Sequence, residues 1–174
     1  MKNVFRATLI ALATVFVAGC SNPPAPQGPT DTELIAAADE LDRQFIEAYN
    51  NGDVDAMMAL YWNSPELAVY LPGEMVVTGY DQVQATFAKA FEMGADATLE
   101  LNDSKNIVFG SAVLGHGLWT WTMTVPDSEP VTGQGRYTDM KVMVDGKMVY
   151  VSDHASMPMP PMPEATEDTT AAAI

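Results

Sequence analysis

The residues of this chain with the clearest chemical potential lie in the segment Met148 to Ser156. Read as a strand, this segment places Tyr150, Ser152 and His154 on one face, because successive side chains alternate. A histidine beside hydroxyl groups can act as a general base, a hydrogen-bond donor or an anion partner, since imidazole changes charge near physiological pH. Alternatively, His154 is a structural residue whose nitrogens are satisfied by a neighbouring hydroxyl or carbonyl. His154 is therefore the candidate catalytic residue.

The preceding segment, Thr132 to Val144, places Arg136 on the same face as Met140. An arginine on an apolar strand face must be paired or must face a cavity. Arg136 could bind a carboxylate ligand through two parallel hydrogen bonds. The alternative is an internal ion pair with an acidic residue of the first helix, for which the candidates are Asp39, Asp42 and Glu47. A β-bulge in either segment would reverse these faces.

Aromatic residues complete the set of expected ligand contacts. Trp119 and Trp121 share one face of a long segment and either wall a pocket or bury an interface. Tyr49 lies at the end of the first predicted helix, where the mouth of a pocket would form. The expected ligand-binding residues are Arg136, His154, Tyr49, Trp119, Tyr150 and Met140.

The sequence offers little for a metal site or for acid–base catalysis. It holds two histidines, His116 and His154, and one cysteine, so we expect neither a metal nor a cofactor. His116 stands between Gly115 and Gly117. Two glycines this close together in a strand suggest a bulge or a close backbone approach. We find no His–Asp dyad and no isolated carboxylate on an apolar strand face. The sequence therefore favours ligand binding over catalysis, and whether the protein is an enzyme stays open.

The elements that must position these residues follow from hydrophobic periodicity and turn signals. Helices are predicted over 32–50, capped by Asp31 or Thr32, then over about 53–61 and 81–93. Strands are predicted over 67–71, 75–78, 98–109, 112–125, 132–144 and 148–156. This order predicts an α+β fold in which three N-terminal helices pack on a strongly curved antiparallel sheet, leaving a conical pocket.

Four segments in this order resemble the SnoaL-like, or nuclear-transport-factor-two-like, superfamily: 45–53, 79–81, 135–139 and 145–156. In this family the last strand commonly carries a tryptophan where Met148 stands, followed by residues matching His154 and Ser156. The resemblance implies a cone-shaped fold whose last strand lines the hollow. It does not imply a reaction, because the superfamily hosts isomerases, dehydratases, cyclases and assembly modules.

The N-terminus carries a basic start, an apolar stretch from Leu9 to Val17 and then Ala18-Gly19-Cys20. This pattern is typical of a secretory signal, and its end resembles the lipobox of bacterial lipoproteins. We therefore expect a signal peptide over 1–19 and a lipidated Cys20. We further expect a proline-rich tether over 20–31, a domain over 32–157 and a disordered tail over 158–174. The resemblance places the protein in the cell envelope, on the periplasmic face of the outer membrane.

The net charge of the chain limits the kinds of partner that it can bind. The chain has a net charge of −15, which becomes −17 when Lys2 and Arg6 leave with the signal. Such a surface repels nucleic acid, so membrane attachment must come from lipid. The leading hypothesis is a lipid-anchored domain that binds a small, partly apolar ligand and forms a homodimer through its exposed sheet face. The alternatives are a small isomerase, dehydratase or cyclase using His154 and Arg136, and a dimerisation module for an envelope partner.

Overall fold

The computed structural model describes residues 28–92, 96–124 and 127–159. The predicted signal peptide, Cys20, most of the tether and the tail beyond residue 159 lie outside the described residues, so those predictions stay predictions. Within the described ranges, no helix is both long enough and apolar enough to cross a membrane.

Three helices form where the sequence predicts them. α1 runs over Asp31–Asn50, α2 over Val54–Met58 and α3 over Tyr80–Glu92. α1 begins one residue earlier than expected, because Thr30 rather than Asp31 or Thr32 is the cap: its hydroxyl accepts from the Glu33 N–H and the Glu33 side chain accepts from the Thr30 N–H. Asp53 caps α2, because its side chain accepts from the Ala56 N–H, and α2 ends at Met58, three residues before the predicted end.

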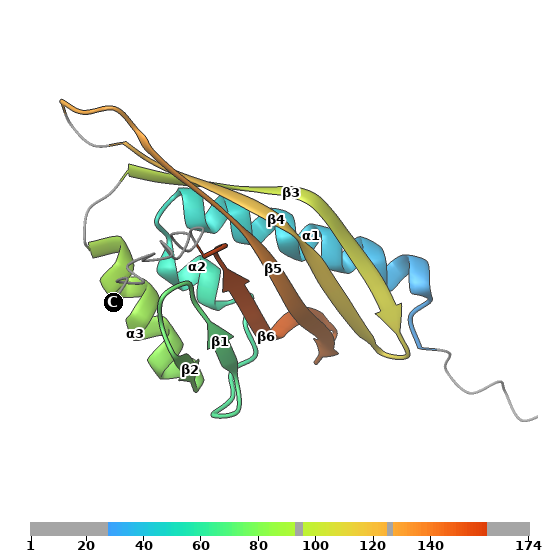
Figure 1. The fold of residues 1–174 in the computed structure, drawn as a ribbon. Coiled ribbons are helices and arrows are strands. Elements are labelled where there is room, and N and C mark those ends of the chain that lie inside the picture. The colour runs from blue at the N-terminus through green and yellow to red at the C-terminus, as the bar shows by residue number, and fades with distance from the viewer. Residues whose placement is uncertain (1–27, 93–95, 125–126, 160–174) are drawn as a thin grey trace, which may run out of the picture.

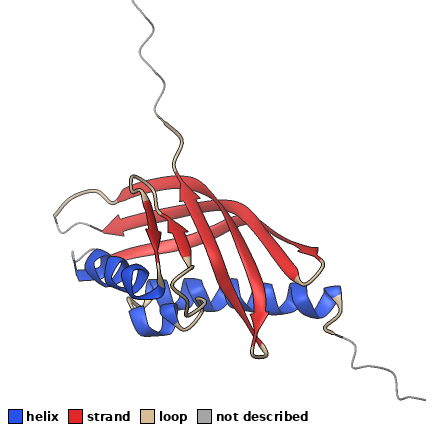
Figure 2. Cartoon of the chain, turned by 90° about the horizontal axis from the view of Figure 1, so that it is seen from below, coloured by secondary structure: helices blue, strands red, loops and turns tan. Residues whose placement is uncertain are grey.

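Six strands form one curved sheet in the order β2-β1-β6-β5-β4-β3. The short strands are β1 (Ala68–Tyr70) and β2 (Val76–Thr78). The long ones are β3 (Asp96–Phe109), β4 (Ala112–Thr124), β5 (Val131–Val144) and β6 (Lys147–Ser156). The α+β architecture is confirmed, but the sheet is mixed rather than antiparallel, because β1 pairs with β6 in parallel. α1 lies along the concave side of the long strands (Figures 1 and 2).

Two bulges interrupt the ladders. In β6, Met140 pairs with Ser152 and Lys141 with Tyr150, so Val151 has no partner of its own. In β3 the register shifts between Asn102 and Lys105, opposite Gly117. Because each bulge adds a residue to one strand, the side chains beyond it change face.

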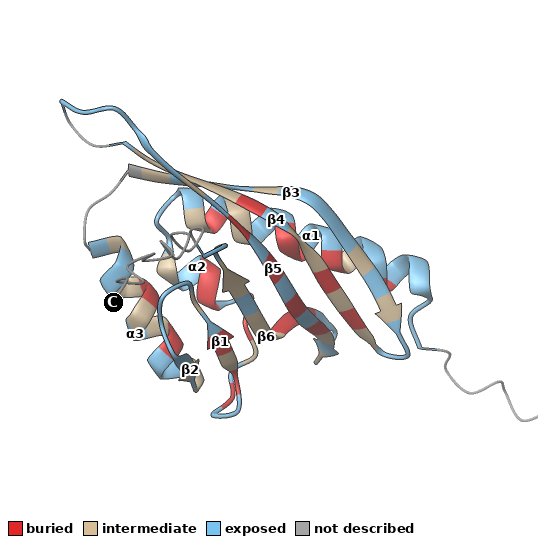
Figure 3. Ribbon diagram, in the orientation of Figure 1, coloured by how far each residue is buried: buried red, intermediate tan, exposed pale blue. Residues whose placement is uncertain are grey.

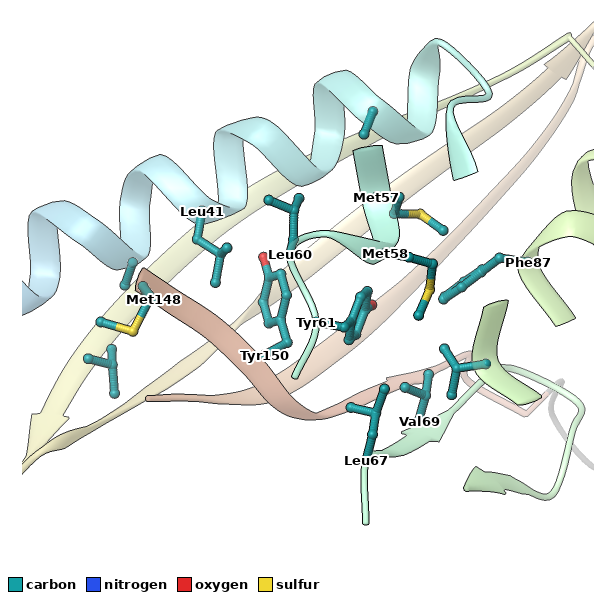
Figure 4. Close-up of a cluster of buried hydrophobic side chains, with 14 of the residues drawn as sticks. Leu41, Met57, Met58, Leu60, Tyr61, Leu67, Val69, Phe87, Met148 and Tyr150 are labelled. Carbon is teal, nitrogen blue, oxygen red and sulfur yellow. The ribbon is translucent and has the colours of Figure 1, made fainter. Parts of the chain in front are cut away.

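The hydrophobic core lies between α1, α2, α3 and the sheet, and the buried positions of β4 and β5 alternate along each strand (Figure 3). Its centre holds Met57 and Met58 of α2 with Leu67 and Val69 near β1, all fully buried. Figure 4 shows Tyr150 reaching from β6 toward α1, with Tyr61 beside it. This packing fills the space between the helices and the sheet around α2 and β1.

Candidate functional site

A pocket of about 400 Å³ opens on the concave side of the sheet. Phe45 and Tyr49 of α1, Phe87 of α3 and the side chains of β3 to β6 form its wall. Seven of its sixteen lining residues are aromatic: Phe45, Tyr49, Phe87, Trp119, Trp121, Tyr137 and Tyr150. A mostly apolar pocket with a few polar groups is the usual form of a small-molecule site.

Asp139 carries one of the two buried side-chain polar atoms that lack a hydrogen-bond partner among the described residues. It projects from the middle of β5 into the pocket wall and is only 4% exposed. Its Oδ1 lies 3.1 Å from Nζ of Lys141 but accepts no hydrogen bond from the described residues. Burial raises the pKa of Asp139 to about 7, although the Lys141 ammonium opposes the rise. A carboxyl group of this pKa exchanges its proton near neutral pH, as a general acid or base must.

Tyr137 lies two residues before Asp139 and points to the same side of β5. Its hydroxyl is buried and has no hydrogen-bond partner among the described residues. Burial raises the pKa of Tyr137 to about 12, so the phenol remains protonated at neutral pH. The pocket wall therefore holds an unused hydrogen-bond donor next to a carboxyl group that titrates near pH 7.

Behind Asp139, a buried ion pair joins β5 to α1. Nζ of Lys141 lies 2.8 Å and 2.9 Å from the two carboxylate oxygens of Asp42 and donates to Oδ1 of Asn106 at 2.8 Å. Asp42 also accepts from the Tyr150 hydroxyl at 2.5 Å and from Nδ2 of Asn106 at 3.0 Å. Because every polar atom of Lys141 and Asp42 is matched, the pair is stable despite its burial.

Asp153 forms a second acidic point on the pocket wall. The Tyr61 hydroxyl donates to its Oδ2 at 2.8 Å. Burial raises the pKa of Asp153, and the Tyr61 hydrogen bond offsets part of that rise. Tyr150 and Asp153 are three residues apart, and both reach the pocket because the bulge at Val151 shifts the alternation of β6 by one residue.

Glycines on neighbouring strands make room for these side chains. Gly115 lies opposite Asp139, and a Cβ there would clash with Asp139 and Lys141. Gly117 lies opposite Tyr137, where a Cβ would come within 2.8 Å of its ring. Gly135 lies opposite Trp119, whose indole would meet any Cβ at that position. The close backbone approach predicted at these glycines is found at Gly117, where a Cβ would lie 2.9 Å from the Asn102 carbonyl oxygen, whereas side chains rather than backbone crowd Gly115.

The family model described as the SnoaL-like domain matches residues 43–151 of this chain. These residues include the pocket wall from Phe45 to Tyr150 and most of the sheet. The chain belongs to the SnoaL-like family.

Solved structures share this fold at low sequence identity. A candidate dehydratase of the NTF2-like family from Streptomyces avermitilis is 18% identical, with a TM-score of 0.67 over 75% of this chain and 100% of that one. An NTF2-like superfamily protein from Salmonella enterica serovar Typhimurium is 16% identical, with a TM-score of 0.67 over 80% and 99%. An NTF-2 like protein of unknown function from Shewanella oneidensis is 23% identical, with a TM-score of 0.57 over 70% and 97%. No curated protein matches this chain.

Three residues of the predicted set lie in the pocket of this SnoaL-like domain. Tyr49, Trp119 and Tyr150 all line it, and Trp121 does so beside Trp119. Nε1 of Trp119 donates to the carbonyl of Arg136 at 3.2 Å, which leaves the carbon surface of the indole for the pocket. That these residues bind a ligand stays a prediction.

The other three residues lie on the opposite side of the sheet. Arg136 and Met140 are exposed on the convex face, where Nε of Arg136 donates to the Ser156 hydroxyl at 3.2 Å. His154 is exposed as well and packs against Tyr70 in an edge-on contact. The prediction that Arg136, Met140 and His154 face the cone is wrong.

The two errors have different causes. On β5, the inward set is Tyr137, Asp139 and Lys141, which is more polar than the outward set, so hydrophobic patterning selected the wrong face. On β6, the starting face at Tyr150 was correct, and the bulge at Val151 then turned His154 outward. The predicted ion pair from a strand cation to α1 exists, but Lys141 rather than Arg136 makes it with Asp42.

Sequence reasoning missed Asp139, Asp153 and Tyr137. The glycines opposite Asp139 and Tyr137 were a usable signal, since a large inward side chain on one strand needs a small neighbour on the next. Asp139 is not an isolated carboxylate on an apolar strand face, because it shares its face with Tyr137 and Lys141, but the aromatic residues of other elements surround it in the pocket. Among the described residues, no three His, Cys, Asp or Glu side chains form a group that could hold a metal ion.

Proposed function

We propose that this SnoaL-like domain binds a small, largely apolar ligand in its pocket and that Asp139 transfers a proton to or from it. The observation that carries the proposal is a carboxyl group with a pKa of about 7 in an aromatic pocket. One of its oxygens lies 3.1 Å from Nζ of Lys141 but accepts no hydrogen bond from the described residues. Strongly shifted carboxyl groups in clefts are candidates for acid–base catalysis. The class of reaction is isomerisation or elimination.

Two side chains, Asp139 and Tyr137, supply the groups that the proposed proton transfer needs. The Asp139 carboxylate removes a proton from a carbon next to a carbonyl, and the electron pair moves to the carbonyl oxygen. The Tyr137 hydroxyl donates a hydrogen bond to that oxygen as its negative charge grows. The proton then returns to another carbon, or a leaving group departs with the electron pair. Lys141, which is 0% exposed behind the pocket wall, positions Asp139, and Asp42, which also lines the pocket, holds Lys141 in place.

A general proton-transfer probe tests this proposal without knowledge of the substrate. Base-catalysed elimination of 5-nitrobenzisoxazole removes one carbon-bound proton and releases a coloured phenolate. We expect the wild-type rate to rise with pH through a midpoint near the Asp139 pKa of about 7. Asp139→Asn should lower the rate by about 10²–10⁴-fold, whereas Asp145→Asn, in the exposed β5–β6 turn, should not. An Asp139→Asn variant as active as wild type would contradict the proposal.

We also propose that the domain is anchored through lipid on Cys20 and acts in the periplasm at the outer membrane. The support is the signal-like segment 1–19 with its Ala18-Gly19-Cys20 end. Cys20→Ser should leave the protein unprocessed or release it from membranes, as measured by fractionation and by the mass of the mature chain. Unchanged membrane fractionation and maturation of this variant would contradict the anchor.

We further propose that the convex sheet face forms a homodimer. Ile107, Leu114 and Met140 lie side by side in register across β3, β4 and β5 on that face. Ile107 is 41% and Met140 46% exposed, and nearby Leu118 is 48% exposed. An apolar row on an open sheet is typical of a surface that a second copy covers. The alternative is that this face binds a different envelope protein.

A further inference from the structure

The charges of the pocket are unbalanced. Of its sixteen lining residues, Asp42, Asp139 and Asp153 are acidic, and none is Lys, Arg or His. The nearest cation, Lys141, lies behind the wall with 0% exposure. Its ammonium is occupied by Asp42 and Asn106 and contacts one oxygen of Asp139. One cation thus stands against three carboxyl groups.

Asp153 is the carboxyl group with the least compensation. Its one hydrogen bond among the described residues comes from the neutral Tyr61 hydroxyl, to Oδ2. No Lys, Arg or His of the described part of the chain lies within ion-pair distance of it. A carboxyl group in this position is either protonated or neutralised by a ligand that carries positive charge.

The aromatic walls favour the same kind of ligand. Trp119, Trp121 and Tyr49 line the pocket, and the Trp119 N–H is already used on the backbone. Aromatic ring faces attract organic cations, and tryptophan does so most strongly. Aromatic walls and acidic groups together are the usual means of recognising an ammonium group. A carboxylate ligand would instead meet acidic groups without an opposing cation.

We infer that the pocket binds a small organic cation, an amine with an apolar body. Its ammonium group lies at Asp153, within reach of Asp139, and its apolar part lies against Trp119 and Trp121. This inference rests on the proposed function of the pocket and adds the charge of the ligand. It replaces the anionic ligand that the sequence suggested for Arg136, because Arg136 lies on the far side of the sheet.

Three probes of similar shape and different charge test this inference. Full-length protein is titrated by calorimetry with 2-phenylethylamine, 2-phenylethanol and phenylacetate, each at neutral pH. The amine should bind at least about tenfold more tightly than the alcohol, and phenylacetate should bind most weakly. Equal or tighter binding of the alcohol or of phenylacetate would overturn the inference, and wild-type protein alone decides this point.

Two matched variants locate the charge. Asp153→Asn keeps an acceptor for the Tyr61 hydroxyl and should lower the affinity for the amine about tenfold while leaving the alcohol unchanged. Asp145→Asn removes one exposed charge and should change neither affinity. Equal losses in both variants would overturn the role of Asp153, because a general surface potential would then explain the preference.

The outcomes separate this inference from the proposed proton transfer. If 5-nitrobenzisoxazole elimination depends on Asp139 but the amine is not preferred, the ligand charge is wrong and the proton transfer stands. If the amine is preferred but elimination does not depend on Asp139, the pocket binds cations and the proton transfer fails.

Discussion

A strand of a sheet usually turns its apolar side chains inward and its polar side chains outward, whereas β5 does the reverse. The inward face carries Tyr137, Asp139 and Lys141, whereas the outward face carries Arg136, Thr138 and Met140. Charges are buried on the inside because α1 supplies Asp42 at 2.8 Å from Lys141. Apolar surface remains on the outside because no other part of the described chain covers it. Partners on other elements, rather than the polarity of the strand, therefore decide which face of β5 lies inside.

Removing Lys141, the cation of the inward face, should lower the free energy of unfolding more than removing Arg136, the cation of the outward face. Lys141→Met leaves Asp42 and Asp139 buried without an ammonium, which should cost about 3–5 kcal/mol in the free energy of unfolding. Arg136→Met removes a cation of the outward face and should cost less than about 1 kcal/mol. Urea denaturation of both variants measures the difference, and similar losses would show that the two faces are energetically alike.

The pH dependence of stability should come from the inner face. Folded Asp139 has a pKa of about 7, compared with 3.8 for an ordinary aspartate, so the folded state holds an extra proton between these values. This group therefore stabilises the fold fully below about pH 4, and its contribution is lost as the pH rises to 7. Asp139→Asn should reduce the stability difference between pH 4 and pH 8 by about 2–4 kcal/mol.

The pH experiment has a matched control. Asp145→Asn, in the exposed turn, should leave the pH dependence of the free energy of unfolding as in wild type. If Asp139→Asn also leaves it unchanged, Asp139 does not hold its proton in the folded state, and the electrostatic contrast between the faces is smaller than the geometry indicates.

Gly115 of β4 tests how tightly the inward side chains of β5 are packed. Gly115→Ala places a methyl group against Asp139 and Lys141 and should cost about 1–3 kcal/mol in unfolding free energy. His116→Ala, whose side chain points to the convex face next to Thr138, should cost less than about 0.5 kcal/mol. Thermal unfolding of the pair tests this, and a neutral Gly115→Ala would mean that the ion pair shifts freely.

The smallest effect on monomer stability is expected on the outer face. Met140→Glu introduces charge into the exposed apolar row and should disrupt a dimer while changing the monomer free energy of unfolding by no more than about 0.5 kcal/mol. Sedimentation at tens of micromolar should show a dimer for wild type and a monomer for the variant. A wild-type monomer at that concentration would refute the proposed dimer.

Much of the fold could be predicted because its signals are local. The 3.6-residue period of α1, the cap at Asp53 and the Asp145-Gly146 turn depend on a few neighbouring residues each. The strand ends fall within two residues of the prediction for the same reason. The parallel pairing of β1 with β6 was missed, because it joins segments about eighty residues apart and leaves no local pattern.

The candidate site could be predicted only in its aromatic part. Trp119 and Trp121 share a face in any regular strand, so their common place in the pocket needed only alternation. Alternation alone could not predict the orientations of Asp139 and His154. Asp139 faces inward because Asp42 and Lys141 meet across α1 and β5, and His154 faces outward because Val151 adds one residue to β6.

The elements, their order, the family and the acidic charge of the chain can be read from the sequence, because these properties depend on residue types and short-range spacing. The tertiary structure alone decided which side of the sheet is the inside of the pocket. A strand has two faces of equal geometry, and only the contacts made by α1, the bulge in β6 and the glycines opposite Asp139, Tyr137 and Trp119 distinguish them. The chemistry proposed for this protein follows from that choice of face.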